Sequence, residues 1–124
     1  MGYYTYFSME ARGIKDENEY NSIIDAMKKN ELMSYDDVYG IFDEGKFYEN
    51  DGSAFFEAYQ EAKWYDCEYD MIKFSELFPD VTFKLSGDGE ERDDMWREYF
   101  HNGECELCHA QVVFPLPVEI EWEE

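Results

Sequence analysis

Two cysteines and two histidines near the end of the sequence could carry metal or redox chemistry: His101, Cys105, Cys108 and His109. The run from Cys105 to His109 matches the C-x-x-C-H pattern of haem attachment, and cysteine and histidine are also zinc ligands. The same run follows Asn102-Gly103, a pair typical of a tight hairpin, so we expect a strand here. In a strand, Cys105 and Cys108 point to opposite faces. The sequence therefore favours ordinary strand residues, with a zinc or redox site at these four positions as the alternative.

Nucleophilic catalysis finds little support in the sequence. The two histidines both flank the predicted hairpin, and no G-x-S-x-G motif is present. Adjacent carboxylates are too frequent to mark an acid–base pair, because the chain has 31 Asp and Glu residues. We therefore predict a protein that is not an enzyme and that has no cofactor.

The charge of the chain says more about its partners than about chemistry. The 124 residues have a formal net charge of −21, together with 11 Tyr, 10 Phe and 3 Trp. So many aromatic residues are untypical of a disordered acidic tail and indicate a folded domain. Such a charge repels nucleic acid and anionic membranes, and it accelerates encounters with basic proteins. We expect a basic protein partner, with no direct contact to nucleic acid or membrane.

The sequence also predicts a compartment. No basic segment followed by an apolar one begins the chain, which argues against a secretory signal. An odd number of cysteines fits a reducing environment. We therefore expect a cytoplasmic protein.

The first half of the sequence predicts one strand, one clear helix and an irregular middle. Residues 3–11 are rich in aromatics and predict a strand. Asp16 and Glu19 form a capping box before an apolar stripe that begins at Tyr20, so a helix follows. Residues 34–42 are expected to form a short helix, 46–48 an extended segment and 49–52 a turn. Residues 55–65 are expected to begin as a helix and finish as a strand.

The second half predicts a helix followed by strands. Asp66 is a candidate N-cap for a helix that ends at Pro79. Leu77 is expected to face the core together with the other apolar residues of this helix. Alternation of apolar and polar residues over 81–86 predicts a half-buried strand, and a loop is expected at 87–91. Strands are expected at 95–100 and 104–114. Residues 118–122 alternate again, which predicts an edge strand or an acidic tail.

This order of elements predicts a single α+β domain over residues 1–124. Two helices on one face of a mainly antiparallel sheet would bury their apolar stripes. We expect a ferredoxin-like arrangement with an inserted acidic region at 31–58.

Several short segments resemble those of small proteins carried by bacteriophages and other mobile elements of bacteria. They are the opening Met1-Gly2-Tyr3-Tyr4-Thr5, then Ala62-Lys63-Trp64-Tyr65-Asp66, Phe78-Pro79-Asp80-Val81, Gly87-Asp88-Gly89-Glu90-Glu91, Asp94-Met95-Trp96 and Tyr99-Phe100. These proteins are similar in turn to the Api92-like phage proteins, which implies a ferredoxin-like fold. The resemblance brings no catalytic residues. It implies a mobile-element gene in a bacterial host, a setting in which small acidic proteins often block defence nucleases.

These observations together predict an acidic protein that mimics nucleic acid and inhibits a host defence nuclease. The expected partner is a nucleic-acid-binding enzyme, such as a CRISPR effector or a restriction nuclease. The residues expected to bind it are Asp36, Asp37, Tyr39, Asp43, Glu44, Tyr48, Glu49, Asp51, Asp88, Glu90, Glu91, Asp93 and Asp94. Two alternatives remain: the small zinc or redox protein, and an accessory protein of a mobile element whose charge only maintains solubility.

Overall fold

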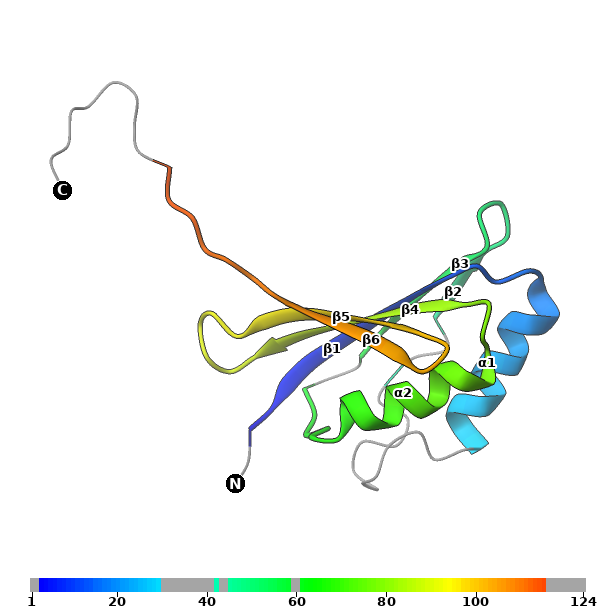
Figure 1. Ribbon diagram of the computed structural model, residues 1–124, viewed down its shortest axis with the longest axis horizontal. Helices are drawn as coiled ribbons and strands as arrows, with labels where there is room; N and C mark the ends of the chain where they lie inside the picture. Colours follow the sequence, from blue (N-terminus) through cyan, green and yellow to red (C-terminus); the bar gives the residue numbers. More distant parts are fainter. Residues whose placement is uncertain (1–2, 30–41, 43–44, 59–60, 116–124) are drawn as a thin grey trace, which may run out of the picture.

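The computed structural model describes residues 3–29, 42, 45–58 and 61–115 of the chain. Six strands and two helices are found in this part (Figure 1). In chain order they are β1 (Thr5–Arg12), α1 (Glu17–Lys29), β2 (Lys46–Tyr48), β3 (Ser53–Glu57), α2 (Cys67–Leu77), β4 (Thr82–Gly89), β5 (Met95–His101) and β6 (Glu104–His109).

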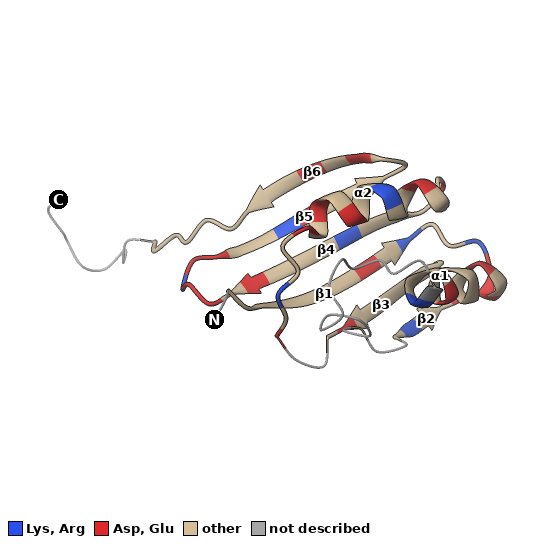
Figure 2. Ribbon diagram, turned by 90° about the horizontal axis from the view of Figure 1, so that it is seen from below, with Lys and Arg blue, Asp and Glu red and all other residues tan. Residues whose placement is uncertain are grey.

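The strands form one antiparallel sheet in the order β2-β3-β1-β4-β5-β6. Both helices lie on the same face of this sheet, and within the described residues the opposite face carries no helix (Figures 1 and 2). We call this second face the open face. The predicted α+β class, with an antiparallel sheet and two helices, is confirmed.

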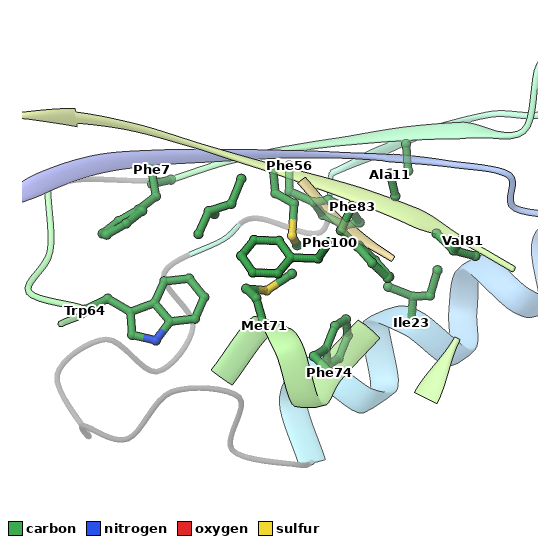
Figure 3. Packing of buried hydrophobic residues seen from close by; sticks show 14 of the residues in the cluster. Phe7, Ala11, Ile23, Phe56, Trp64, Met71, Phe74, Val81, Phe83 and Phe100 are labelled. Carbon is green, nitrogen blue, oxygen red and sulfur yellow. The ribbon is translucent and has the colours of Figure 1, made fainter. Parts of the chain in front are cut away.

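The core lies between the sheet and the two helices. Side chains of a strand alternate between faces, and in β1 the buried residues Phe7, Met9 and Ala11 alternate with more exposed neighbours. Phe56 of β3, Phe83 of β4 and Phe100 of β5 share the buried face with them. From the helices, Ile23, Met71 and Phe74 pack against this face (Figure 3). Much of the aromatic content of the sequence is thus core.

The start of α1 follows the predicted capping chemistry. The Asp16 carboxylate accepts a 2.8 Å hydrogen bond from the backbone N–H of Glu19. The Glu19 carboxylate in turn accepts a 2.9 Å bond from the N–H of Lys15, one residue before the cap. The first bond satisfies a backbone donor that the helix start leaves without a partner, whereas the second reaches the residue before the cap instead of the cap itself. At α2, by contrast, the side chain of Asp66 makes no capping hydrogen bond.

The middle of the chain differs from its prediction. Residues 53–57 form strand β3, so the helix expected to begin at residue 55 is wrong, and this strand pairs with residues 8–12 of β1. The alternation of buried Ala54 and Phe56 with exposed Phe55 and Glu57 is the period of a strand. Residues 46–57, placed in an acidic insertion by the sequence, thus supply two strands of the sheet. Of the helix expected at 34–42, only Phe42 is described, and it forms an isolated bridge to Ala58.

Two strand boundaries and the placement of one side chain in the second half also differ from the prediction. Strand β4 continues to Gly89, through residues expected to form a loop, because it pairs with β1 over its whole length and with β5 as far as Asp88. Strand β6 ends at His109 rather than at residue 114. Leu77 is 53% exposed instead of facing the core. The segment 118–122 lies outside the described residues.

The hairpin between β5 and β6 is confirmed. Asn102 and Gly103 have φ values of 46° and 87°, the left-handed conformation that both centres of a type I′ turn require. In the described part of the chain, neither helix has the length and apolarity needed to cross a membrane.

Candidate functional site

The densest described group of predicted partner-binding residues lies in the turn between β4 and β5. Residues 88–94, which we call the acidic turn, contain five carboxylates and one arginine. Asp88, Glu90, Glu91 and Asp93 are exposed, and Asp94 is half-buried. The turn projects from one end of the sheet, where its acidic residues stand out in Figure 2. The structure therefore brings this part of the predicted site together.

Tyr3 holds the acidic turn in place from the other end of the sequence. Its hydroxyl donates a 2.6 Å hydrogen bond to Oδ2 of Asp94 and accepts a 2.9 Å bond from the backbone N–H of Glu91. The neighbouring carboxylate raises the pKa of the Tyr3 hydroxyl, because it stabilises the protonated form that donates. A side chain at Gly89 would overlap both the Tyr3 hydroxyl and Asp94. The glycine is thus what allows this contact.

A second contact joins the residues before β1 to the acidic turn. The backbone N–H of Tyr4 donates to the Glu90 carboxylate, while the Lys63 ammonium lies 5.0 Å from the centre of the Tyr4 ring. Two backbone hydrogen bonds within the turn complete it, one of them of 2.7 Å from the N–H of Gly89 to the carbonyl of Asp94. The carboxylates therefore stand on a backbone held at several points rather than on a loose loop.

Aromatic packing supports the sheet beneath the acidic turn. The Phe7 ring lies edge-on to two indoles, at 5.4 Å from Trp64 and 6.2 Å from Trp96 between ring centres. The Trp64 Nε1–H donates a 2.7 Å hydrogen bond to Asp70, which ties this cluster to α2. The acidic turn thus continues from a rigid, packed part of the sheet.

The other predicted binding residues lie elsewhere. Tyr48 is exposed at the end of β2, and Glu49 and Asp51 are exposed in the turn between β2 and β3. Thr5 pairs with Gly89 and Arg12 pairs with Ser53, so the two turns lie at opposite ends of β1, about 23 Å apart at the usual rise of a strand. The structure does not bring the two groups together. Five further predicted residues lie outside the described part of the chain: Asp36, Asp37, Tyr39, Asp43 and Glu44.

Cations gather on the open face of the sheet. Four of them lie there: Lys46 on β2, Arg12 on β1, Lys84 on β4 and Arg97 on β5. Glu10 stands between two of them: its carboxylate is 2.9 Å from Lys84 Nζ and 2.7 Å from Arg12 Nε. Lys84 foremost, then Arg12, lowers the pKa of Glu10. The open face thus holds four of the ten Lys and Arg residues, whereas Arg92 is the one cation within residues 88–94.

The four alternative zinc ligands do not converge. In the β5–β6 pairing, Cys105 stands opposite Phe100, which is buried on the helix side, and Cys108 stands opposite Arg97 on the open face. The expectation that the two cysteines point to opposite faces is confirmed. His101 shares the open face, where Thr82 Oγ1 lies 3.1 Å from its Nδ1, while His109 shares the helix side.

A different set of ligand-type atoms does converge on the helix side of the sheet. One ligand atom each from Glu68, Glu98 and Cys105 lie within 4.8 Å of one another, the one such group in the described residues. Glu98 is only 3% exposed, and burial, together with the nearby Glu68, raises its pKa to about 7. Sequence analysis missed this group, although one signal was available. Glu98 occupies a position of β5 that alternation assigns to the buried side, next to Trp96 and Phe100.

No family model, curated protein or solved structure matches the chain.

Proposed function

We propose that this protein binds a basic, nucleic-acid-binding surface of another protein through its acidic turn, and so competes with nucleic acid. The observation that carries the proposal is the anchored turn itself. It holds five carboxylates within residues 88–94, on a backbone fastened by Tyr3. Carboxylates at fixed positions pair with Arg and Lys side chains at a smaller entropic cost than carboxylates on a mobile loop.

The distribution of charge supports this choice over a uniformly acidic surface. The cations of the open face are partly neutralised by Glu10, whereas the acidic turn itself contains five carboxylates and one cation, Arg92. A negative end of the molecule steers a basic partner toward that end. The turn between β2 and β3 lies at the other end of β1. We therefore place the first contact at residues 88–94, with Tyr48, Glu49 and Asp51 as a separate surface.

The partner class follows from the same chemistry. A groove lined with Arg and Lys that accepts phosphates is the complement of such a turn. The resemblance to mobile-element proteins suggests a host defence enzyme, so a CRISPR effector or a restriction nuclease is the partner that we propose. Inhibition by competition needs neither a cofactor nor an active site.

Matched charge variants test this proposal. The triple variant Asp88→Asn, Glu91→Gln and Asp93→Asn removes three exposed charges from the acidic turn. The control variant Glu17→Gln, Asp25→Asn and Glu104→Gln removes three exposed charges elsewhere. A purified effector nuclease, captured as the partner from host lysate, should bind the first variant about tenfold or more weakly and the control almost normally.

Salt and competing DNA provide the decisive readouts. We expect the affinity to fall steeply as salt concentration rises and the nuclease's own nucleic acid substrate to displace the protein. Binding that changes neither with salt concentration nor on addition of nucleic acid would contradict the mimicry of nucleic acid. Equal effects of the two triple variants would show that net charge alone matters, as expected for an accessory protein whose charge maintains solubility.

The arrangement of the first four strands supports a finer proposal about the fold. In the order β4-β1-β3-β2, strand β3 lies antiparallel between β1 and β2, and helices follow β1 and β3. This is the split βαβ order of ferredoxin-like domains, to which β5 and β6 would add at the β4 edge. Interstrand nuclear Overhauser contacts from β1 to both β3 and β4 would test it.

A further inference from the structure

The helix-side cluster formed by Glu68, Glu98 and Cys105 plays no part in the proposed function. Its members come from three elements: Glu68 from the first turn of α2, Glu98 from β5 and Cys105 from β6. Glu98 pairs with Leu107, so Cys105 is its diagonal neighbour across the two strands. Helix α2 packs against β5 and brings Glu68 over the pair. Segments about 30 residues apart in sequence thus meet at one point.

Glu98 is the feature that points to a ligand. Its Oε2 is buried and has no hydrogen-bond partner among the described residues. A buried carboxylate oxygen without a donor is costly, since it has given up water and gained no replacement. The neighbouring Glu68 adds repulsion when both groups are charged. A cation at this point would satisfy the oxygen and neutralise the repulsion.

From this geometry we propose that Glu68, Glu98 and Cys105 bind a divalent transition metal ion, with zinc the best fit. Zinc takes cysteine sulfur and carboxylate oxygen together, usually with four ligands in a tetrahedron. Calcium and magnesium prefer oxygen alone, so the thiolate disfavours them. Three protein ligands leave the fourth position for water.

The separations are compatible with such a site. The three ligand atoms lie within 4.8 Å of one another, whereas the ligands of a tetrahedral zinc ion are about 3.5 Å apart. Glu68 and Cys105 are both exposed and can adjust by side-chain rotation, while Glu98 is held in the sheet. Their exposure also provides an entry path for the ion. The site therefore has one fixed ligand and two adjustable ones.

Cobalt provides the test, because a thiolate bound to Co²⁺ gives a charge-transfer band in the near ultraviolet. The full chain, without a histidine tag and under reducing conditions, is titrated with Co²⁺ and then with Zn²⁺. Excess Mg²⁺ is present to occupy weak acidic sites. We expect one Co²⁺ per chain, the thiolate band, and displacement by one Zn²⁺.

Variants separate this site from the rest of the acidic surface. Cys105→Ser should abolish the band, whereas Cys108→Ser, a matched change on the open face, should retain it. Glu98→Gln should weaken Zn²⁺ binding by at least about tenfold, and its circular dichroism in the absence of metal reports whether it folds. Absence of stoichiometric Co²⁺ binding, or a band that survives Cys105→Ser, would overturn the proposal. The Cys105→Ser variant should still bind the basic partner protein of the proposed function. Loss of the metal site can therefore be distinguished from failure of that function.

Discussion

The Tyr3 hydroxyl and the Asp94 carboxylate, 91 positions apart in the sequence, are joined by a hydrogen bond of 2.6 Å. The same hydroxyl accepts the backbone N–H of Glu91 at 2.9 Å. One side chain near the start of the chain thus fixes both the backbone and a carboxylate of the acidic turn. This contact links the geometry of the turn to the binding that we propose for it.

Replacing Tyr3 by Phe removes both hydrogen bonds and keeps the ring. We expect the Glu91 amide to exchange its hydrogen at least about tenfold faster, because it loses its acceptor and the turn opens more often. Hydrogen exchange followed by NMR measures this rate. The control is Tyr48→Phe, which removes an exposed hydroxyl at the other end of β1. Unchanged exchange at Glu91 would show that the turn holds its shape without Tyr3.

Gly87 lies directly against the indole of Trp96, and the two residues pair across β4 and β5. A Cβ at Gly87 would overlap the six-membered ring of Trp96. Gly87→Ala should therefore lower the free energy of unfolding by about 1–3 kcal/mol in urea denaturation. Ser86→Ala, at the preceding position on the open face, should change the free energy of unfolding much less.

A second substitution identifies the cause of that loss. In the Trp96→Leu background, Gly87→Ala should lower the free energy of unfolding markedly less, because the smaller side chain leaves room for the methyl group. If Gly87→Ala lowered the free energy of unfolding equally in both backgrounds, the loss would come from the β4 backbone and not from contact with Trp96.

The ion pair of Glu10 and Lys84 predicts a dependence on pH. Lys84→Met keeps most of the side chain and removes its charge, and we expect a loss of stability below about 1 kcal/mol, since the pair is partly exposed. The folded state lowers the pKa of Glu10 below its usual 4.5. The contribution of the pair is therefore complete above that pH and is lost as the pH falls through the folded-state pKa.

Urea denaturation of both proteins between pH 3 and pH 7 measures this difference. Lys15→Met, which removes an exposed cation outside the sheet, controls for the added net charge. A stability difference between wild type and Lys84→Met that stays constant down to pH 3 would contradict the assignment.

Glu98→Gln should stabilise the metal-free protein. At pH 8 in EDTA the wild type holds a buried negative charge beside Glu68, and an amide of the same shape removes it. We expect the free energy of unfolding to rise by about 1–2 kcal/mol. Glu106→Gln makes the same change in net charge on the exposed open face of β6 and should be nearly neutral. A less stable Glu98→Gln protein would mean that the carboxylate has a structural role in the metal-free state.

Local patterns in the sequence predicted those elements whose stability is local. The helix after Asp16 has its cap and its apolar stripe within a few residues, and the Asn102-Gly103 turn depends on the two residues that form it. Strand β3 was missed, and its residues 55–57 were wrongly predicted to begin a helix, because the strand is too short to show its period clearly. Its strand conformation depends on pairing with β1, a partner 45 residues away.

The sequence by itself determined the class of the fold, the negative charge and the opposite facing of Cys105 and Cys108, since each follows from composition or from the period of a strand. Only the tertiary structure decided which charges meet. Strand pairing separated the two predicted acidic groups to opposite ends of β1. Packing of α2 on β5 brought Glu68 to Glu98 and Cys105. Such encounters depend on contacts between distant segments, which no local pattern in the chain encodes.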